Sequence, residues 1–457
     1  MAFQEISTTG YGTRVGNSFK AIGGGLILFC LATALLWWNE GRAVKTEKML
    51  DEAGNAYVEM ENPDKRDASL NGQLICGTAM ATTEDSLSDV QFGIGAKAIS
   101  LRRTVEYYQW VEHSEESSED KLGGKQETTT TYTYSREWTD RPVESAKFKD
   151  PAYQNKNFVL TTIDAAEQYA SNVSWGAYKL TESLIRSISS RKALNLNISE
   201  ALLTQFDKDA KTAYERFYGV KDQSAEQPAE TVTLSDSAKA VSDSINAMMA
   251  NAENKKDLEY IHQAAGVLYF GRVPGSPEVG DVRVTFDIVT PALVTVMAVV
   301  DGDTFKPFKA KNGKRFQILE MGRMSGDKII EEQKDVNTML LWVLRIVGVL
   351  LVIIGLRNIL GILETLLKVV PFVANIFGWG IGIISSILGI VWSLIIIALA
   401  WLFYRPLLGI SLLAIAAFLT WFFAFKGKEK LKKSGIRSLQ LCNFETKGLK
   451  KRTDSAT

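Results

Sequence analysis

Four long stretches of this 457-residue chain carry almost no charged side chain. The first covers residues 21–39, and the other three follow one another at residues 336–357, 369–404 and 406–425. A helix needs about 20 apolar residues to cross the roughly 30 Å of a bilayer's hydrocarbon core. We therefore predict a polytopic α-helical membrane protein with four spans, one near the N-terminus and three clustered in the C-terminal third.

Two of these stretches need interpretation. In the first, Ala32-Thr33-Ala34 has the small-x-small pattern of a signal-peptide cleavage site. The apolar run continues to Trp37-Trp38, however, and tryptophan rings favour the headgroup layer, so an uncleaved anchor is the better interpretation. The third stretch exceeds the length of one ordinary crossing. We expect Pro371 to separate a short preceding segment from the spanning helix within residues 369–404.

Charged side chains are sorted along the chain, although the whole chain has no net charge. Residues 426–457 form a basic tail with a net charge of +7, whereas residues 41–335 carry about −10. Because Lys and Arg beside membrane spans stay on the cytosolic side, we expect residues 1–20 and the tail in the cytosol. The acidic domain at 40–335 is then non-cytosolic, in the periplasm of a bacterium or in the lumen of a eukaryotic endoplasmic reticulum or inner nuclear membrane.

The same sorting bears on partners. It does not fit a broad nucleic-acid-binding surface, so we predict no nucleic acid as a partner. The lipid bilayer itself is the first expected partner. The basic tail could also attract anionic lipids, at about 1 kcal/mol for each Lys or Arg near the membrane surface.

Arg345 lies inside the second apolar stretch, nine residues after its first residue. A charged side chain at the centre of a membrane helix costs at least ~2.5 kcal/mol, so such an arginine is a candidate functional site. The simpler interpretation is that Arg345 reaches the interface or pairs with a polar group of a neighbouring span. We prefer the simpler one, since no second charge within the spans completes a transport path.

The third span carries a small residue every three or four positions, namely Gly378, Gly382, Ser386 and Gly389. Small side chains on one helix face let another helix approach closely. This stripe favours either packing among the clustered spans of one chain or formation of a homo-oligomer, and the pattern does not choose between them.

The domain between the first two spans is predicted to be α+β. Its first part indicates a strand at 73–79 and a hairpin of strands at 99–113 and 128–138, joined by a polar loop. Helices are expected at 177–189, 200–218 and 234–249, and a linker at 218–231. Strands follow at 266–272, 280–287, 293–300 and 315–320, and a short helix from Ser325 leads into the second span. The hairpin would present a contact surface of aromatic rings: Tyr108, Trp110, Tyr132, Tyr134 and Trp138.

The residues that usually carry catalysis or bind metals are sparse. The chain has two histidines, His113 and His262. Glu259 and His262 have the Glu-x-x-His spacing that can place two metal ligands on one helix face, but no second pair completes a site. Cys76 is better explained as a small buried strand residue than as a nucleophile. We predict no catalytic residues, no metal and no cofactor.

Several motifs resemble the transmembrane protein 43 (LUMA) family. They are residues 37–43 (WWNEGRA), 108–112 (YQWVE), 132–138 (YTYSREW), 280–284 (GDVRV) and 397–407 (IALAWLFYRPL). The resemblance runs from the first span to the last and implies the same architecture of one span, a large domain and three spans. It also implies no enzymatic activity, a place in the endoplasmic reticulum and inner nuclear membrane for animal members, self-association, and contacts with lamins and emerin-type partners.

The leading hypothesis is a non-enzymatic membrane scaffold or organiser that acts through self-association and binding of other membrane proteins. A transporter or channel subunit is the alternative, and it would depend on Arg345 and on serines of the third span. A membrane-anchored hydrolase that uses Cys76, His113 or His262 is less favoured.

Overall fold

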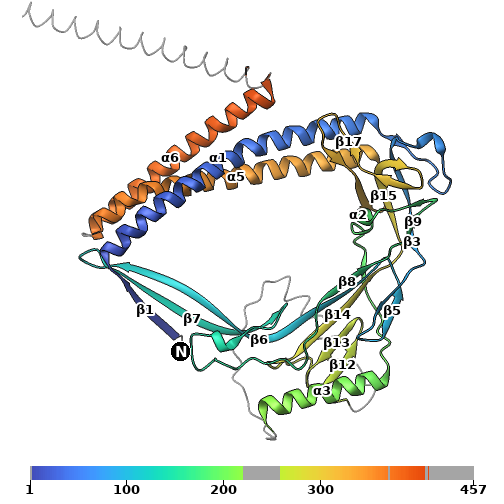
Figure 1. Cartoon of the computed structure of the whole chain (residues 1–457), viewed down its shortest axis with the longest axis horizontal. Helices are drawn as coiled ribbons and strands as arrows, with labels where there is room; N and C mark the ends of the chain where they lie inside the picture. Colours follow the sequence, from blue (N-terminus) through green and yellow to red (C-terminus); the bar gives the residue numbers. More distant parts are fainter. Residues whose placement is uncertain (1–2, 220–257, 369–370, 407–409, 411–457) are drawn as a thin grey trace, which may run out of the picture. The chain divides into compact units, whose positions relative to one another are not determined.

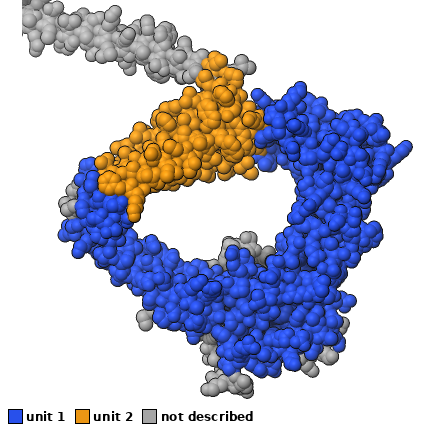
Figure 2. Space-filling model, in the orientation of Figure 1, with its two compact units in different colours: residues 1–17, 46–336, 364–377 blue, residues 18–45, 337–363, 378–457 orange. Residues whose placement is uncertain are grey.

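The computed structural model describes residues 3–219, 258–368, 371–406 and 410 of the chain (Figure 1). They divide into two compact units, coloured separately in Figure 2. Unit 1, with residues 1–17, 46–336 and 364–377, contains the β-strands. Unit 2, with residues 18–45, 337–363 and 378–457, is helical in its described part.

The larger sheet of unit 1 has eight strands in the described part of the chain. Its order is β1-β7-β6-β14-β13-β12, with β8 paired to β6 and β11 paired to β14, and every pairing is antiparallel. The strands are β1 (Phe3–Thr9), β6 (Ser100–Asp120), β7 (Gln126–Thr139), β8 (Ala166–Tyr169), β11 (Arg191–Ala193), β12 (Ile261–Ala264), β13 (Val267–Phe270) and β14 (Val282–Val289).

The second sheet has seven described strands in the order β10-β9-β3-β15-β16, with β19 on β15 and a parallel β2 on β3. They are β2 (Val58–Glu59), β3 (Leu74–Thr83), β9 (Val173–Trp175), β10 (Tyr178–Lys179), β15 (Ala292–Asp301), β16 (Thr304–Lys306) and β19 (Ile318–Met321). Two small hairpins and two helices complete unit 1: β4 (Ser86–Asp89) with β5 (Ile94–Lys97), β17 (Phe308–Lys309) with β18 (Arg315–Phe316), α2 (Glu182–Ile185) and α3 (Glu200–Tyr218).

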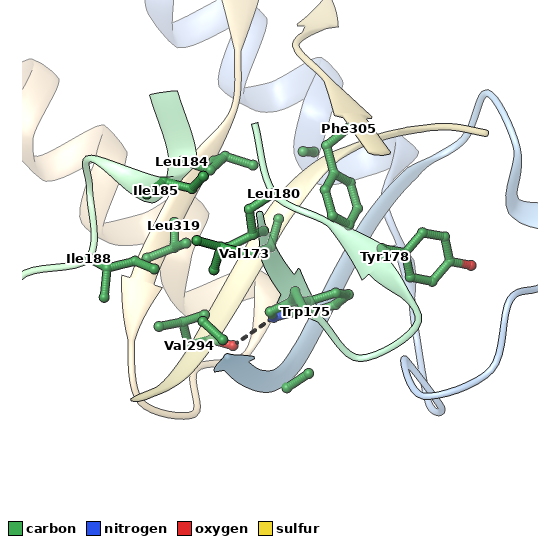
Figure 3. Packing of buried hydrophobic residues seen from close by; sticks show 14 of the residues in the cluster. Val173, Trp175, Tyr178, Leu180, Leu184, Ile185, Ile188, Val294, Phe305 and Leu319 are labelled. Carbon is green, nitrogen blue, oxygen red and sulfur yellow. Dashed lines mark hydrogen bonds between the residues drawn. The ribbon is translucent and has the colours of Figure 1, made fainter. Parts of the chain in front are cut away.

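Strand β15 separates two hydrophobic cores because its side chains alternate between faces. Val294 and Val296 point into a core around Trp175, which is fully buried and donates its indole N–H to the carbonyl of Val294 at 3.2 Å (Figure 3). Met297 and Val299 point into the opposite core. That core also contains the end of α1 at Met49, Leu50 and Ala53 and the start of α5 at Ile329 and Ile330.

The larger sheet packs against α3. Ser199 caps this helix with its hydroxyl oxygen, which accepts from the backbone N–H of Leu202. Apolar residues at helical spacing, among them Phe206 and Ala210, then meet buried β13 and β14 side chains such as Phe270 and Phe286. The predicted helix at 200–218 is confirmed.

In the described part of the chain, three helices are long and apolar enough to cross a membrane: α1 (Tyr11–Ala56), α5 (Gly326–Leu367) and α6 (Pro371–Tyr404). Within unit 2, α1 and α5 run antiparallel, since Gly25 meets Gly355 while Leu36 meets Gly348. A Cβ atom on Gly25 would lie 2.8 Å from the carbonyl oxygen of Gly355, and one on Gly355 would lie 2.9 Å from the backbone nitrogen of Phe29. Only glycine permits this close crossing.

Most of the predicted strands of unit 1 are confirmed, and the helix that begins after Ser325 does continue into the second span as α5. Two predictions were wrong. The polar segment after residue 113 is not an extended loop, because β6 and β7 continue to Asp120 and from Gln126 and leave a turn of residues 121–125. A strand whose two faces are both solvated needs no apolar alternation, so the pattern gave no signal.

The second wrong prediction is the helix at 177–189. Tyr178 and Lys179 pair with β9 instead, and only α2 is helical, because Tyr178, Leu184 and Ile188 all fill the core around Trp175. Glu259 and His262 do not share a helix face, since His262 lies in β12. The predicted helix at 234–249, most of the linker at 218–231, the stretch at 407–425 and the tail at 426–457 lie outside the described residues.

The N-terminal segment also differs from expectation. Residues 1–20 were expected in the cytosol, across the membrane from the domain at 40–335. Seven of them form β1, which pairs with β7 from Phe3 opposite Tyr132 to Thr9 opposite Gln126 (Figure 1). No strand was expected there, and the side of the membrane on which residues 1–20 lie stays a prediction.

Candidate functional site: a buried ion pair among the apolar helices

An ion pair joins α1 to α5 inside unit 2. The guanidinium of Arg345 donates from Nε to Glu40 Oε1 at 2.6 Å and from Nη2 to Glu40 Oε2 at 2.9 Å. Glu40 is 2% exposed and Arg345 is 8% exposed, so neither charge reaches open solvent within the described chain. This two-point geometry is the strong form of an arginine–carboxylate contact.

Two tryptophans enclose the pair. Trp401 of α6 donates its indole N–H to Glu40 Oε2 at 2.8 Å. The guanidinium carbon of Arg345 lies 4.7 Å from the centre of the Trp342 ring and 5.4 Å from that of Trp401. A cation over an aromatic face gains about 2 kcal/mol or more when it is desolvated. The site therefore draws side chains from all three apolar helices.

A second set of polar contacts lies next to the ion pair. Asn39 donates to the carbonyl of Leu341 at 3.0 Å, and Arg42 donates to the side-chain oxygen of Asn39 and to that of Asn337. Asn337 in turn donates to the carbonyl of Ala43 at 3.0 Å. These bonds link the same two helices, α1 and α5, over the next turn.

Gly41 lets α6 approach this region. A Cβ atom at Gly41 would lie 2.5 Å from the Tyr404 ring, so any larger residue would displace that ring. Trp37, one turn earlier on α1, contacts the rings of Phe403 and Tyr404. Most residues of the motif at 37–43 thus contact α5 or α6, whereas Trp38 is 56% exposed.

The energetics favour a positioning role for the pair. Two unpaired charges in a low-dielectric bundle would cost several kcal/mol each, whereas a paired and hydrogen-bonded set recovers most of that cost. Both oxygens of Glu40 and both named nitrogens of Arg345 are used within the bundle. The arrangement therefore fixes the register of three helices and leaves this carboxylate no free oxygen for acid–base chemistry.

Comparison with known proteins identifies the family. A family model described as transmembrane protein 43 matches residues 107–406. The chain belongs to the transmembrane protein 43 family. Transmembrane protein 43 of Mus musculus is 28% identical over 408 residues, which cover 87% of this chain and 88% of the mouse protein.

Two further relatives agree. The Homo sapiens protein is 26% identical over 420 residues, with 90% and 91% of the two chains covered, and a Drosophila melanogaster homolog is 25% identical over 399 residues, with 86% and 91% covered. No solved structure matches the chain.

Two of the motifs that resemble the transmembrane protein 43 family meet at the ion pair. The motif at 37–43 supplies Glu40 and Gly41, and the motif at 397–407 supplies Trp401 and Tyr404. The two motifs lie more than 350 residues apart in the sequence, yet they share these contacts. In unit 2, the ion pair is therefore where these two family motifs contact each other.

The small residues of α6 differ in their surroundings, although Gly382 and Gly389 are two turns apart and lie on the same side of the helix. Gly389 is buried, and a Cβ atom there would lie 2.5 Å from Ile353 of α5. Among the described residues, none would lie within 4 Å of a Cβ atom on Gly382, and Ser386 donates its hydroxyl to the carbonyl of Gly382 at 2.8 Å. Gly378 is half-buried. Packing within the chain thus uses Gly389, together with the buried Ser385 and Ser393, and leaves Gly382 open.

The five aromatic side chains predicted as a contact surface of the β6–β7 hairpin pack against other residues of unit 1, and each is buried or half-buried. Tyr134 stacks on Tyr153 with ring centres 4.1 Å apart, and its hydroxyl donates to Glu112 at 2.6 Å. The remaining rings have these partners: Trp110 with Tyr153, Tyr132 with Phe3, Tyr108 with Trp138, and Trp138 with Tyr269. The rings therefore hold the hairpin to its neighbours and offer little free surface to a partner.

Two residues of the motif at 280–284 make buried polar contacts at the base of the β6–β7 hairpin. Arg283 is 4% exposed, pairs with Glu106 at 2.7 Å and lies 4.5 Å from the centre of the Trp138 ring. Asp281 is 2% exposed and accepts from the Tyr269 hydroxyl at 2.6 Å and from the backbone N–H of Glu278 at 2.8 Å. Burial raises the pKa of Asp281 from 3.8 to about 7, despite these two hydrogen bonds, which lower it.

The remaining candidate residues lie apart. Burial raises the pKa of Cys76 to about 12, so its thiol stays protonated. His113 is exposed and contacts Glu137 at 2.8 Å, while His262 faces the carbonyl of Arg272 and has its pKa lowered by burial. Within the described residues, no group of three or more His, Cys, Asp or Glu side chains could hold a metal ion.

Sequence reasoning singled out Arg345 but not its partner. Glu40 is the first residue of the predicted domain at 40–335, directly after the first apolar stretch, and was not linked to Arg345. The available signal was that Glu40 directly follows the first apolar stretch and Arg345 lies in the first half of the second, so the two charges come close when α1 and α5 run antiparallel. Trp342 and Trp401 were also missed, since an aromatic residue in an apolar stretch gives no sign of its partner.

Removal of either charge should destabilise the helix bundle, because the remaining charge would be buried without a partner. We expect Glu40→Leu and Arg345→Leu each to lower the free energy of unfolding by about 3–5 kcal/mol. The double variant should lose much less than the sum of the two. Unfolding of the full chain in detergent measures this, with exposed Arg357→Leu as the control; strictly additive losses would contradict the pairing.

Stability should depend on the protonation of Asp281. Because its folded pKa is raised, the folded state holds a proton that the unfolded state has lost between pH 4 and about 7. The stabilisation is complete below pH 4 and is lost as the pH rises through 7. Relative to Asp281→Asn, the wild type should lose up to roughly 4 kcal/mol over this range. Parallel stability–pH curves for the two proteins would refute this assignment.

Proposed function

We propose that this chain is a non-enzymatic membrane scaffold or organiser that acts through self-association and partner binding. The observation that carries the proposal is the division of small residues on α6. Gly389 is used within the chain, while Gly382 remains open to a helix of a second copy. An organiser needs such a division, because one part of the helix must hold the fold together and another part must remain available.

The surroundings of Gly382 support a helix as its partner. Gly380 is equally open, and neighbouring large side chains stand exposed, with Trp379 at 79% and Ile383 at 53%. In lipid, two helices gain little from apolar burial and associate through close backbone contact at small residues. A glycine gap flanked by protruding rings and aliphatic side chains fits that mode of contact.

The ion pair supports the proposal indirectly. Self-association through one helix face requires that the helix keep a fixed rotation about its own axis. The contacts of Trp401 with Glu40 and of Gly389 with Ile353 set that rotation for α6. The open face of Gly382 is then presented by a fixed bundle, which costs less entropy on association.

A transporter or channel subunit is the second candidate, and the charged pair Glu40–Arg345 among apolar helices is the observation that favours it. Its polar groups are satisfied by one another, which supports a structural role over a conducting one. Flux through reconstituted protein that is abolished by Arg345→Leu would promote this candidate above the scaffold.

The chain is an integral membrane protein. Which membrane it occupies belongs to the proposal: the endoplasmic reticulum or inner nuclear membrane in a eukaryote, or the plasma membrane in a bacterium. We also propose that residues 407–425 provide a fourth apolar helix, since they form an uncharged run of sufficient length. Lamins, emerin-type proteins and other membrane proteins are proposed partners on the strength of the family resemblance alone.

Substitution of Gly382 should weaken self-association without unfolding the bundle. We expect Gly382→Leu to lower the association constant in detergent micelles about tenfold, which corresponds to ~1.4 kcal/mol. Gly389→Leu should instead lower the stability of the single chain, because its side chain would collide with Ile353. Ile383→Leu is the matched control. An unchanged oligomer size in Gly382→Leu would remove self-association through this face from the proposal.

A further inference from the structure

The β17–β18 hairpin concentrates positive charge in a domain that is acidic as a whole. Residues 304–316 contain five basic side chains and no acidic one, whereas residues 41–335 together carry about −10. Four of the five are exposed and one, Lys314, is half-buried. The five are Lys306, Lys309, Lys311, Lys314 and Arg315. A local reversal of sign of this kind attracts an anionic partner to one surface of the domain.

The two faces of the hairpin separate its apolar side chains from its charged ones. Phe308 pairs with Phe316, and Lys309 pairs with Arg315. Phe316 is buried in the core that contains the end of α1, and Phe308 packs against the same core. Because side chains alternate along a strand, Lys309 and Arg315 share the opposite face, where both are exposed.

The exposed face brings like charges together. Lys309 and Arg315 lie directly opposite each other, and like charges in that position destabilise an antiparallel pair. Among the described residues, the side chains of Lys309, Lys311 and Arg315 have no hydrogen-bond or ion-pair partner. The nearby Glu52 of α1 accepts from the backbone N–H of Lys311 at 3.0 Å. An anion bound between the two opposed cations would replace their repulsion by two charge-assisted contacts.

The hairpin is fixed to α1 just beyond the first apolar stretch. Lys314 donates its ammonium to the hydroxyl of Thr46 at 2.6 Å. Phe316 is buried in one core with Leu50 of the same helix, and Figure 1 shows β17 beside this end of α1. The position of the charged face relative to residues 46–53 is therefore set by packing and by a hydrogen bond.

Chain length keeps this anchoring point close to the bilayer. Helix α1 is unbroken from Tyr11 to Ala56, and its uncharged stretch ends at Asn39. At 1.5 Å per residue, Thr46 lies about 10 Å further along the helix. The headgroup layer adds about 5–8 Å to each side of the hydrocarbon core. Attraction between charges extends over a further ~8 Å in physiological salt. The anchoring point thus lies within reach of the headgroups, a limit that chain length sets for any orientation of the two units.

We propose that the exposed face of the β17–β18 hairpin binds the phosphate group of an anionic phospholipid in the membrane that holds α1. Arg315 supplies a guanidinium that matches two phosphate oxygens, and Lys309 supplies a point charge on the opposite strand. Lys311 adds attraction at the turn. A lipid is the source of this phosphate because the anchor on α1 holds the face where headgroups are concentrated. The proposal does not depend on self-association through Gly382.

Fluorescence quenching of the full chain in lipid nanodiscs tests the proposal. Cys30 and Cys442 are replaced by Ala, Cys76 is fully buried, and a fluorophore is attached to Pro307→Cys at an exposed position beside β17. A trace of lipid with a spin-labelled headgroup quenches this fluorophore when the hairpin is docked. We expect stronger quenching in nanodiscs that contain phosphatidylglycerol than in pure phosphatidylcholine. The excess should vanish in about 1 M salt, where the screening length falls to ~3 Å.

Removal of the three unpaired charges should abolish the excess quenching. Each Lys or Arg near an anionic surface contributes enough attraction to change the ratio of docked to undocked hairpin about fivefold. The variant Lys309→Gln/Lys311→Gln/Arg315→Gln should therefore show the same quenching in both lipids. Its unfolding midpoint should not fall, because these side chains are exposed and make no contact that the fold needs.

The matched control removes the same charge from exposed positions elsewhere in unit 1. It is Lys156→Gln/Lys192→Gln/Lys208→Gln, and it should keep the excess quenching in phosphatidylglycerol. Equal quenching of the unmodified hairpin in the two lipids, or loss of the excess in the control as well, overturns the proposal. Loss of the excess on addition of inorganic phosphate at constant ionic strength would assign the face to a soluble anion and overturn its assignment to lipid.

Discussion

Burial of the Glu40 carboxylate among apolar helices is the constraint on which unit 2 depends. A buried carboxylate must be paired, and the three donors that satisfy it come from Arg345 and Trp401. These donors belong to α5 and α6, so their pairing with α1 joins all three helices at one point. The glycine contacts of Gly25 with Gly355 and of Gly389 with Ile353 follow from the same register. Polar satisfaction and close packing thus select one arrangement.

Buried charged side chains with specific partners also occur in unit 1. Arg283 pairs with Glu106 under Trp138, and Asp281 is enclosed by Tyr269, so the base of the long hairpin is fixed by buried polar groups. Asp120 repeats the arrangement at the tip with Arg14 and Lys368. The motifs that resemble the transmembrane protein 43 family therefore coincide with buried charges and the rings that cover them. This supports a structural function for the protein.

The apolar stretches, the strand pattern and α3 could be predicted because each follows from periodicity within a short segment. Arg345 could be recognised as unusual for the same reason. Its partner could not, since the contact of Glu40 with Arg345 depends on how two helices 305 residues apart pack. The extension of β6 and β7 escaped prediction because both faces are polar, and β1 because its partner lies far along the chain. Local patterns predict elements, and long-range contacts decide the sites.

The most direct test of the ion pair is a high-resolution structure of the full chain in a lipid nanodisc, with density for the side chains of α1, α5 and α6. Our account predicts that Arg345 contacts both oxygens of Glu40 and that the Trp401 indole donates to the same carboxylate. A side chain of Arg345 that extends to the headgroups, with Glu40 facing water, would contradict it.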